Sequence, residues 1–289
     1  MTDESREVQP PPTRTLAQDA QLALLLEVTG TPKPGNVDRA HDHDDLRFEH
    51  FVTGAVGALS GLRLAADGEP VGRAFERAVA GMSQQAAGNT QFGALLVTIP
   101  LVRAAAEGDL SPSGASAVTE ATTVEDAANF YRAFEHVDVA VDDPPEGMEP
   151  LDVRRGAAAV PVLRERGLTL YDVMERSTDV DGLAREWVGG FDRTFHAAER
   201  LLDTEGPVPD RAARVFLELL ADEPDTFVAI NHDEATARRV SAQAAEALDG
   251  DRDPWALADE LVAEGINPGT TADLVAAGLF VALQRGLEL

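Results

Sequence analysis

Helical periodicity is the feature that most constrains what this chain can fold into. After residue 14, apolar residues recur every three or four positions in nearly every long segment, and no long stretch alternates with a period of two. The clearest stripe consists of Phe48, Phe51, Val52, Ala55, Val56, Leu59 and Leu62. Asp45 is placed to cap the helix that carries it. The pattern predicts an all-α protein.

The same reading predicts one globular domain of about a dozen helices over residues 15–289, because no internal repeat or low-complexity linker interrupts them. We expect helices over residues 15–28, 48–62, 70–82, 90–107, 124–137, 153–166, 182–202, 212–220, 234–248 and 271–287. Pro100 should kink the fourth of these, and residues 137–143 could form a short strand. Residues 1–14 contain three consecutive prolines and many charges, so we expect a disordered arm.

Charge and composition exclude several classes of protein. The 289 residues include 51 acidic and 24 basic side chains, a formal net charge of −27, which would repel the backbone of a nucleic acid. The absence of cysteine excludes disulfides, a thiol nucleophile and a zinc–thiolate site. No apolar run reaches the roughly 18 residues of a membrane span, and the N-terminus does not resemble a signal peptide. We therefore expect a cytoplasmic protein without membrane or nucleic-acid partners.

The basic residues are almost all arginine, and Lys33 is the single lysine. An acidic, lysine-poor composition is typical of proteins from a high-salt cytoplasm, where the Debye length is only ~3 Å at 1 M salt. The composition predicts a halophilic protein whose carboxylates lie mostly at the surface. Solvated surface is therefore the alternative interpretation of every acidic cluster.

The first loop that breaks the helical pattern covers residues 29–45. Pro32 and Pro34 stiffen the backbone on both sides of Lys33, which favours a defined place for its ammonium and predicts contact with a phosphate. The alternative is that the position of Lys33 is accidental.

The same loop ends in closely spaced aspartates and histidines before a helix. Capping explains one aspartate, either Asp44 or Asp45, but not the whole group. Oxygen and nitrogen donors at this density suit Mg²⁺ or Mn²⁺. The candidate metal ligands are Asp38, His43, Asp44 and Asp45.

Two further loops precede apolar helices. Asn89 and Thr90 stand between glycines, where free helix N–H groups could bind an anion, although a cap by Thr90 would also explain them. Thr270 and Thr271 follow a Pro-Gly pair, and either could be a cap. Asp273, one turn into the last apolar helix, is not explained by capping.

In their order and approximate spacing these motifs resemble the triphosphoribosyl-dephospho-CoA synthase family, over roughly residues 20–285. The resemblance rests on residues 31–38, 43–45 with Phe48, 88–90 and 268–274, supported by residues 152–156 and 225–227. It implies an all-helical transferase that moves the 5-triphosphoribosyl group of ATP to the ribose 2′-hydroxyl of 3′-dephospho-CoA and releases adenine. The product would be the precursor of the prosthetic group of citrate or malonate lyases.

Two departures from the family pattern indicate a divergent member with a changed acceptor. After Asn89-Thr90 the family usually has a polar pair such as His-Lys, whereas this chain has Gln91-Phe92. The segment from Asp38 to Asp45 is also shorter than in the lyase-associated enzymes of the family.

The chemistry of this transfer requires carboxylates. An oxocarbenium-like transition state favours a nearby carboxylate, and the incoming hydroxyl requires a general base. The candidate catalytic residues are Asp38, Asp44 and Asp273. We expect ATP, with Mg²⁺ or Mn²⁺, to bind at residues of all three loops, namely Lys33, Gly35, Asn89, Thr90, Thr270 and Thr271.

Two other functions remain open. His41, His43, Asp44 and the triplet Asn231-His232-Asp233 weakly suggest a metal-dependent nucleotide phosphohydrolase. A non-catalytic nucleotide-binding protein is the third possibility. The products distinguish them, because ribosyl transfer releases adenine and hydrolysis releases phosphate or pyrophosphate.

The charge of the chain predicts a salt-dependent stability. We expect the melting temperature to rise between 0.1 M and 3 M KCl, because salt screens the repulsion among 51 carboxylates. Thermal unfolding followed by circular dichroism measures this, and equal melting temperatures at the two salt concentrations would contradict the halophile interpretation.

Overall fold

The computed structural model describes residues 14–141, 144 and 148–289, and within them all regular structure is helical. The α-helices are α1 (Leu16–Thr29), α2 (Phe48–Ala66), α3 (Val71–Met82), α4 (Phe92–Ala106), α5 (Pro112–Glu120), α6 (Val124–Ala133), α7 (Val160–Arg166), α8 (Leu170–Glu175), α9 (Gly182–Val188), α10 (Asp192–Asp203), α11 (Val208–Asp222), α12 (Thr226–Asn231), α13 (Glu234–Asp249), α14 (Pro254–Ala263) and α15 (Gly269–Gln284). Two 3₁₀ helices, η1 (Glu149–Leu151) and η2 (Val153–Ala159), precede α7. The predicted all-α class and single domain are confirmed. The predicted arm falls, apart from Arg14, outside the described residues.

The predicted boundaries were wrong where glycine interrupts a helical pattern. The expected helix over 153–166 is divided into η2 and α7, with Gly156 at a positive φ of 52°. The expected helix over 182–202 is divided into α9 and α10, because Gly190 and Phe191 adopt positive φ values of 75° and 63°. Helices α5, α8, α12 and α14 were not predicted, and residues 137–141 form no strand.

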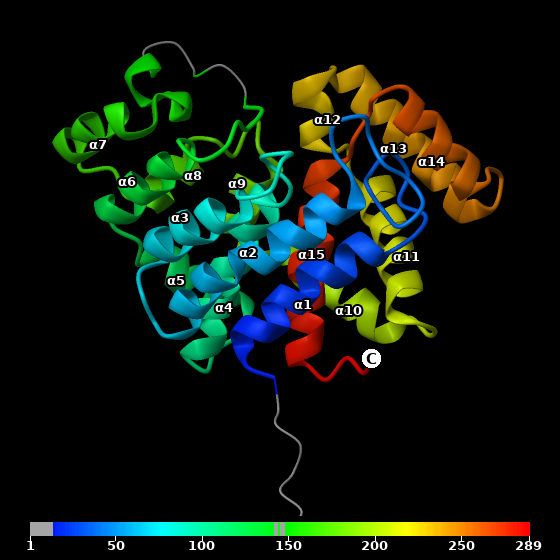
Figure 1. The fold of residues 1–289 in the computed structure, drawn as a ribbon, viewed down its shortest axis with the longest axis horizontal. Helices are drawn as coiled ribbons and strands as arrows, with labels where there is room; N and C mark the ends of the chain where they lie inside the picture. The colour runs from blue at the N-terminus through cyan, green and yellow to red at the C-terminus, as the bar shows by residue number, and fades with distance from the viewer. Residues whose placement is uncertain (1–13, 142–143, 145–147) are drawn as a thin grey trace, which may run out of the picture.

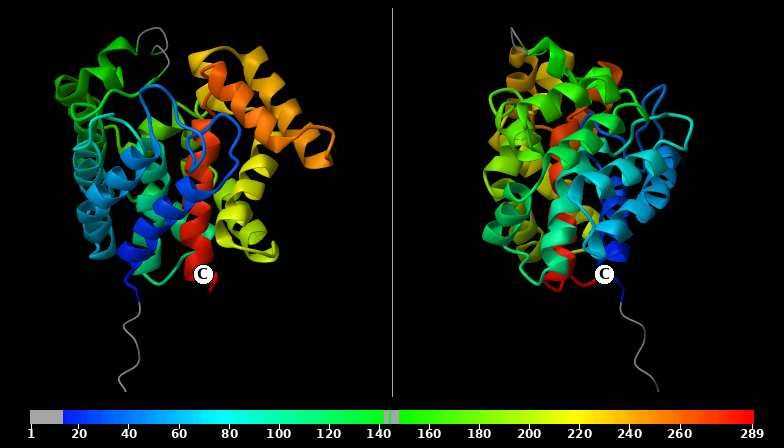
Figure 2. Two further views of the ribbon diagram at one scale, coloured as in Figure 1. Left: turned by 45° about the vertical axis from the view of Figure 1, so that its right-hand side comes forward. Right: turned by 90° about the vertical axis from the view of Figure 1, so that its left-hand side faces the viewer.

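Helix α15 runs through the middle of the molecule (Figures 1 and 2). It packs against α1, α4, α10 and α11, and thirteen of its sixteen residues are buried. The other three, including Asp273 in the first turn near the centre of the fold, are partly buried. A carboxylate at this position therefore faces a space inside the protein.

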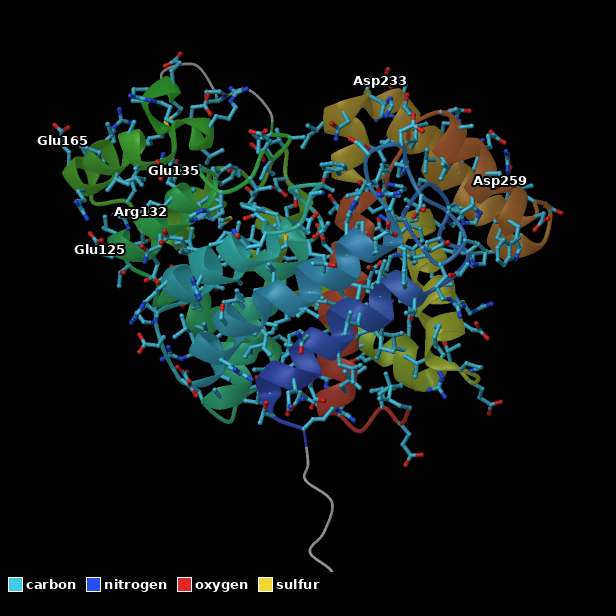
Figure 3. The ribbon with its side chains drawn as sticks, in the orientation of Figure 1. Glu125, Arg132, Glu135, Glu165, Asp233 and Asp259 are labelled. Atoms are coloured by element: carbon cyan, nitrogen blue, oxygen red, sulfur yellow. The ribbon has the colours of Figure 1, made fainter. Side chains whose placement is uncertain are left out.

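Charged side chains lie mainly at the periphery, as Glu125, Glu165, Asp233 and Asp259 illustrate (Figure 3). This agrees with the expectation that most acidic residues are solvated. Within the described residues, no helix combines the length and the apolar character needed to cross a membrane.

The buried face of α2 differs from the predicted stripe. Val56 is 59% exposed, and the helix instead buries small residues that include Gly54 and Gly61. A Cβ atom on Gly61 would lie only 2.4 Å from the carbonyl oxygen of Ala74 in α3. The close approach of the two backbones, which a count of apolar residues cannot reveal, therefore determines the orientation of α2.

This contact predicts that Gly61→Ala lowers the free energy of unfolding by about 1–3 kcal/mol, despite the higher helix propensity of alanine, because α2 and α3 must move apart. Denaturant unfolding measures the effect. Val56→Ala on the exposed face of the same helix is the control, with an expected change within about 0.5 kcal/mol. Equal unfolding midpoints for the two variants would show that the contact between α2 and α3 tolerates a methyl group.

Candidate active site

The three loops singled out in the sequence converge on one cavity of about 510 Å³. Asn36 from the first loop, Asn89 and Thr90 from the second, and Asn267 and Asp273 from the third all line it. A volume in this range is sufficient for a nucleotide-sized ligand. The cavity is therefore the candidate active site.

A hydrogen bond ties the first loop to the third across 231 residues of sequence. The Nδ2 of Asn36 donates to the Oδ1 of Asn267 at 2.8 Å. Gly35 permits this approach, since it has a φ of 77° and a Cβ atom there would lie 2.4 Å from the carbonyl oxygen of Ile266. Gly35 thus packs under the third loop and does not line the cavity among the described residues.

The Asp225 carboxylate fixes the start of α15. Its Oδ2 accepts from both the N–H and the hydroxyl of Thr271 at 2.7 Å, and its Oδ1 accepts from the N–H groups of Phe227 and Val228. The hydroxyl of Thr270 lies 3.0 Å from that of Thr226. Thr270 and Thr271, predicted to bind the nucleotide, are therefore buried in contacts that shape the wall of the cavity.

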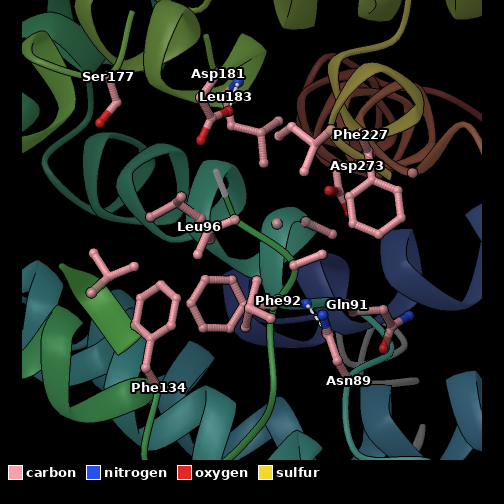
Figure 4. A pocket seen from close by; sticks show the side chains of 18 of the residues that line it. Asn89, Gln91, Phe92, Leu96, Phe134, Ser177, Asp181, Leu183, Phe227 and Asp273 are labelled. Atoms are coloured by element: carbon pink, nitrogen blue, oxygen red, sulfur yellow. Dashed lines mark hydrogen bonds between the residues drawn. The ribbon is translucent and has the colours of Figure 1, made fainter. Parts of the chain in front are cut away.

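Asp273 is the predicted catalytic residue that faces the cavity directly. Its carboxylate occupies the space beside Gly93 at the N-terminus of α4, where an added Cβ atom would lie 1.9 Å from Oδ2. Figure 4 shows Asp273 and Asp181 pointing into the same space. Burial, together with the nearby Glu27, Asp225 and Asp181, raises the pKa of Asp273 well above its ordinary value, although the backbone N–H of Ala94 opposes the shift.

The second loop contributes more apolar than polar surface. Phe92 lines the cavity and packs edge-on against Phe75 and Phe134, with ring centroids 5.0 and 4.9 Å apart. Phe130 and Phe134 extend this aromatic wall, and Figure 4 shows Phe134 on the same side of the cavity as Phe92. Asn89 provides the helix-terminal hydrogen bond that we considered for Thr90, since its Oδ1 accepts from the N–H of Phe92 at 3.2 Å.

Lys33 lies in a different environment from the one we predicted. Its side chain is completely buried, and its ammonium contacts the carboxylate of Glu27 and the Oδ1 of Asn36, the latter at 2.7 Å. Glu27 and Asn36 line the cavity, whereas Lys33 is not among its lining residues. Contact between Lys33 and a phosphate stays a prediction, and the geometry favours a role through its neighbours.

The four predicted metal ligands are not gathered into a site. Asp38 is buried, and its carboxylate accepts hydrogen bonds from the backbone of Lys33, Ala40 and His41 and contacts the His41 ring. The Nε2 of His43 lies 2.8 Å from the carbonyl oxygen of Gly35.

Asp44 and Asp45 are exposed and do not cap α2. The N–H of its first residue, Phe48, donates instead to Asp42 at 2.8 Å. No group of three or more histidine, aspartate or glutamate residues in the described chain is placed to hold a metal ion. The residues of this loop therefore do not fit a resident metal, and the roles predicted for Asp38 and Asp44 find no support in the geometry.

The residues that suggested a phosphohydrolase have other partners. His41 contacts Asp38 and Asp259, and Asp233 caps α13 by accepting from the N–H of Thr236. His232 lies 3.3 Å from the carbonyl oxygen of Gly265.

One end of the cavity is polar and is lined by Glu27, Asn36, Asp181, Asn267 and Asp273. Of these, a role was predicted from the sequence for Asp273 alone. Glu27 is 3% exposed and lines the cavity from α1, and Asp181 lines it from the N-cap of α9. A charged residue directly after the run Leu24-Leu25-Leu26 was the available signal for Glu27. Asn36 and Asn267 lay within predicted loops, but only the fold shows that they meet.

The electrostatics of Asp273 predict how stability depends on pH. A raised pKa in the folded state means that folding favours the protonated form, so stability declines as pH rises from the pKa of the unfolded chain toward that of the folded protein. Asp273→Asn removes this ionisation. Denaturant unfolding gives the free energy of unfolding of the variant and of the wild type at each pH. We expect the difference, variant minus wild type, to be more positive at pH 8 than at pH 5.

Asp251→Asn, at an exposed position, is the matched control and should show no such dependence. A loss of stability for Asp273→Asn that is the same at both pH values would mean that the carboxylate is not destabilised by its surroundings.

Comparisons with known proteins show the family of this chain. A family model described as ATP:dephospho-CoA triphosphoribosyl transferase (CitG) matches residues 13–288. A crystal structure from Archaeoglobus fulgidus, provisionally described as a triphosphoribosyl-dephospho-CoA synthase, is similar in fold, with a TM-score of 0.66 and 24% sequence identity over 81% of this chain and 99% of that one. No curated protein matches the sequence. Because the family match covers nearly the whole chain, the protein belongs to the ATP:dephospho-CoA triphosphoribosyl transferase family and is a transferase.

Proposed function

We propose that this protein transfers the 5-triphosphoribosyl group of ATP to the ribose 2′-hydroxyl of 3′-dephospho-CoA, or of a related acceptor, and releases adenine. Membership of the family supports the reaction class. The observation that carries the proposal is that Glu27 and Asp273 line one cavity that also has an aromatic wall. The carboxylates suit cleavage and formation of a bond at the anomeric carbon, and the aromatic rings suit a nucleobase.

The two carboxyl groups have environments that favour different roles. No cation contacts Asp273 in the described structure, and burial and neighbouring carboxylates raise its pKa, so it is suited to act as a general acid. Burial also raises the pKa of Glu27, but the Lys33 ammonium opposes this shift. Glu27 is therefore the better candidate for the ionised carboxylate.

These roles give a balanced reaction. The bond between C1′ of the ATP ribose and N9 of adenine breaks, and the leaving base takes the electron pair and a proton from Asp273. The 2′-hydroxyl oxygen of the acceptor forms a bond to C1′ and gives its proton to Glu27, whose negative charge also stabilises the developing cation. Solvent returns the proton from Glu27 to Asp273, and the net products are the triphosphoribosylated acceptor and adenine.

The triphosphate requires positive charge that the cavity does not supply in full. Among the described lining residues Glu27, Asp152, Asp181 and Asp273 are acidic, and Arg176 alone is basic. We propose that Mg²⁺ or Mn²⁺ enters with the nucleotide as its counter-ion, because the described residues form no site for the ion.

Chromatography of the products tests the function. With ATP, dephospho-CoA and Mg²⁺ in multimolar salt, the wild type should release adenine and form a triphosphoribosylated acceptor in equal amounts. Asp273→Asn should reduce the rate by about 10²–10⁴-fold, the usual contribution of a general acid or base. Asp251→Asn at the surface should leave the rate unchanged.

The products also decide between the alternatives. Release of phosphate or pyrophosphate without adenine would overturn the proposal in favour of a phosphohydrolase. Binding of ATP without turnover on dephospho-CoA or other ribose-bearing acceptors would overturn it in favour of a binding protein.

A further inference from the structure

The side chain of the single lysine is completely buried. Lys33 is 0% exposed, and the ring of Phe216 lies 5.8 Å from its Nζ. A buried ammonium is tolerated only when its hydrogen-bond donors have partners, because burial removes the favourable interaction with water. Here the partners are Glu27 and Asn36, and both belong to the cavity.

The contacts of Lys33 link the elements that form the polar end of the cavity. Its ammonium joins Glu27 on α1 to Asn36 on the first loop, and Asn36 in turn donates to Asn267 before α15. The backbone N–H of Lys33 donates to the Asp38 carboxylate at 2.9 Å, which holds the loop around it. Lys33 therefore touches cavity-lining groups from outside the cavity.

We propose that Lys33 is a positioning residue, which orients the Glu27 carboxylate and the Asn36 amide, and that it does not bind the triphosphate. The inference rests on the proposed function, and it assigns a role to a residue whose charge would otherwise suggest direct contact with a phosphate.

The charges around Glu27 explain why the ammonium is needed. Burial, together with the negative charge of Asp38, raises the pKa of Glu27, and Lys33 is the cation that opposes this. Glu27 also contributes to the raised pKa of Asp273 on the other side. Without Lys33, Glu27 would face two carboxylates in a poorly solvated place, and its pKa would rise further.

The shape of the site also favours lysine over arginine. The ammonium is compact and fits between Glu27, Asn36 and the Phe216 ring, whereas a guanidinium is wider, planar and directed along a rigid fork. A chain that otherwise uses arginine for every basic residue keeps lysine at this confined position.

Kinetics of Lys33→Met, Glu27→Gln and the double variant test the inference. Lys33→Met should lower kcat by about 10²–10³-fold, the scale seen when one preorganised charge is removed, with little change in the KM for ATP. The acidic limb of its profile of kcat/KM against pH should move to higher pH. The double variant should be no slower than Glu27→Gln, because both substitutions remove the same interaction.

Other kinetic outcomes would overturn the inference. A large rise in the KM for ATP, with losses that multiply in the double variant, would assign Lys33 to the triphosphate. Reduced activity of Lys33→Met with an unshifted pH profile would assign Lys33 a structural role only. Partial recovery of kcat in Lys33→Arg, in contrast, would show that the positive charge at this position matters.

A chemical measurement on the wild-type protein does not depend on turnover or on the folding of variants. Reductive methylation with formaldehyde, followed by mass spectrometry of the Lys33 peptide, reports the accessibility of its amine. Because the ammonium is buried against Glu27, we expect no modification of the folded protein with or without ATP, and full modification in urea. Rapid modification that ATP prevents would show that Lys33 faces the nucleotide, and would overturn the inference whether or not the protein transfers ribose to dephospho-CoA.

Discussion

The fold depends on buried carboxylates that are each bound by donors from another part of the chain. Asp126 accepts from the N–H of Gly72 and from Thr123, and Glu186 accepts from Thr194 and Arg193. A buried carboxylate without such donors would be strongly destabilising, so each set of partners selects one arrangement of the helices. Asp225 follows the same rule for α12 and α15, as Glu27 does with Lys33 for α1 and the first loop.

Asp273 is the exception, and the exception coincides with the cavity. No side chain is seen donating to it in the described structure, and the backbone N–H of Ala94 is the donor that lowers its pKa against burial and three neighbouring carboxylates. The other buried carboxylates described above have several hydrogen-bond donors, whereas Asp273, which lines the cavity, is in an unfavourable environment. Such a group destabilises the folded state, and groups of this kind are common at active sites.

The sequence predicted the class of fold and the three loops, because both depend on local patterns. Periodicity indicated helices, and glycine and proline indicated the breaks, although glycines such as Gly156 and Gly190 divided helices that periodicity alone joined. The cavity could not be predicted in the same way. Glu27 lies within an apolar helix, and Asn36 meets Asn267 only because α15 brings the end of the chain to its beginning.

Individual residues show the same limit. Lys33 was found by its rarity and its flanking prolines, but the sequence did not reveal that its ammonium is buried against Glu27 and Asn36. Asp38, Asp44 and Asp45 have the composition of a metal site, but sequence spacing does not reveal that Asp38 binds the backbone of its own loop while the other two are exposed. Residue type therefore predicted which loops line the cavity better than it predicted the contacts of each side chain.

The negative charge of the protein limits how far electrostatic attraction can contribute to nucleotide binding. Its net charge is −27, and the described cavity adds four carboxylates and a single arginine. Attraction between opposite charges would therefore contribute little to the binding of a triphosphate. Contact with uncharged groups would gain importance, and the wall formed by Phe92, Phe130 and Phe134 offers an apolar surface for a base. Stacking on such a wall would be screened by salt much less than an ion pair.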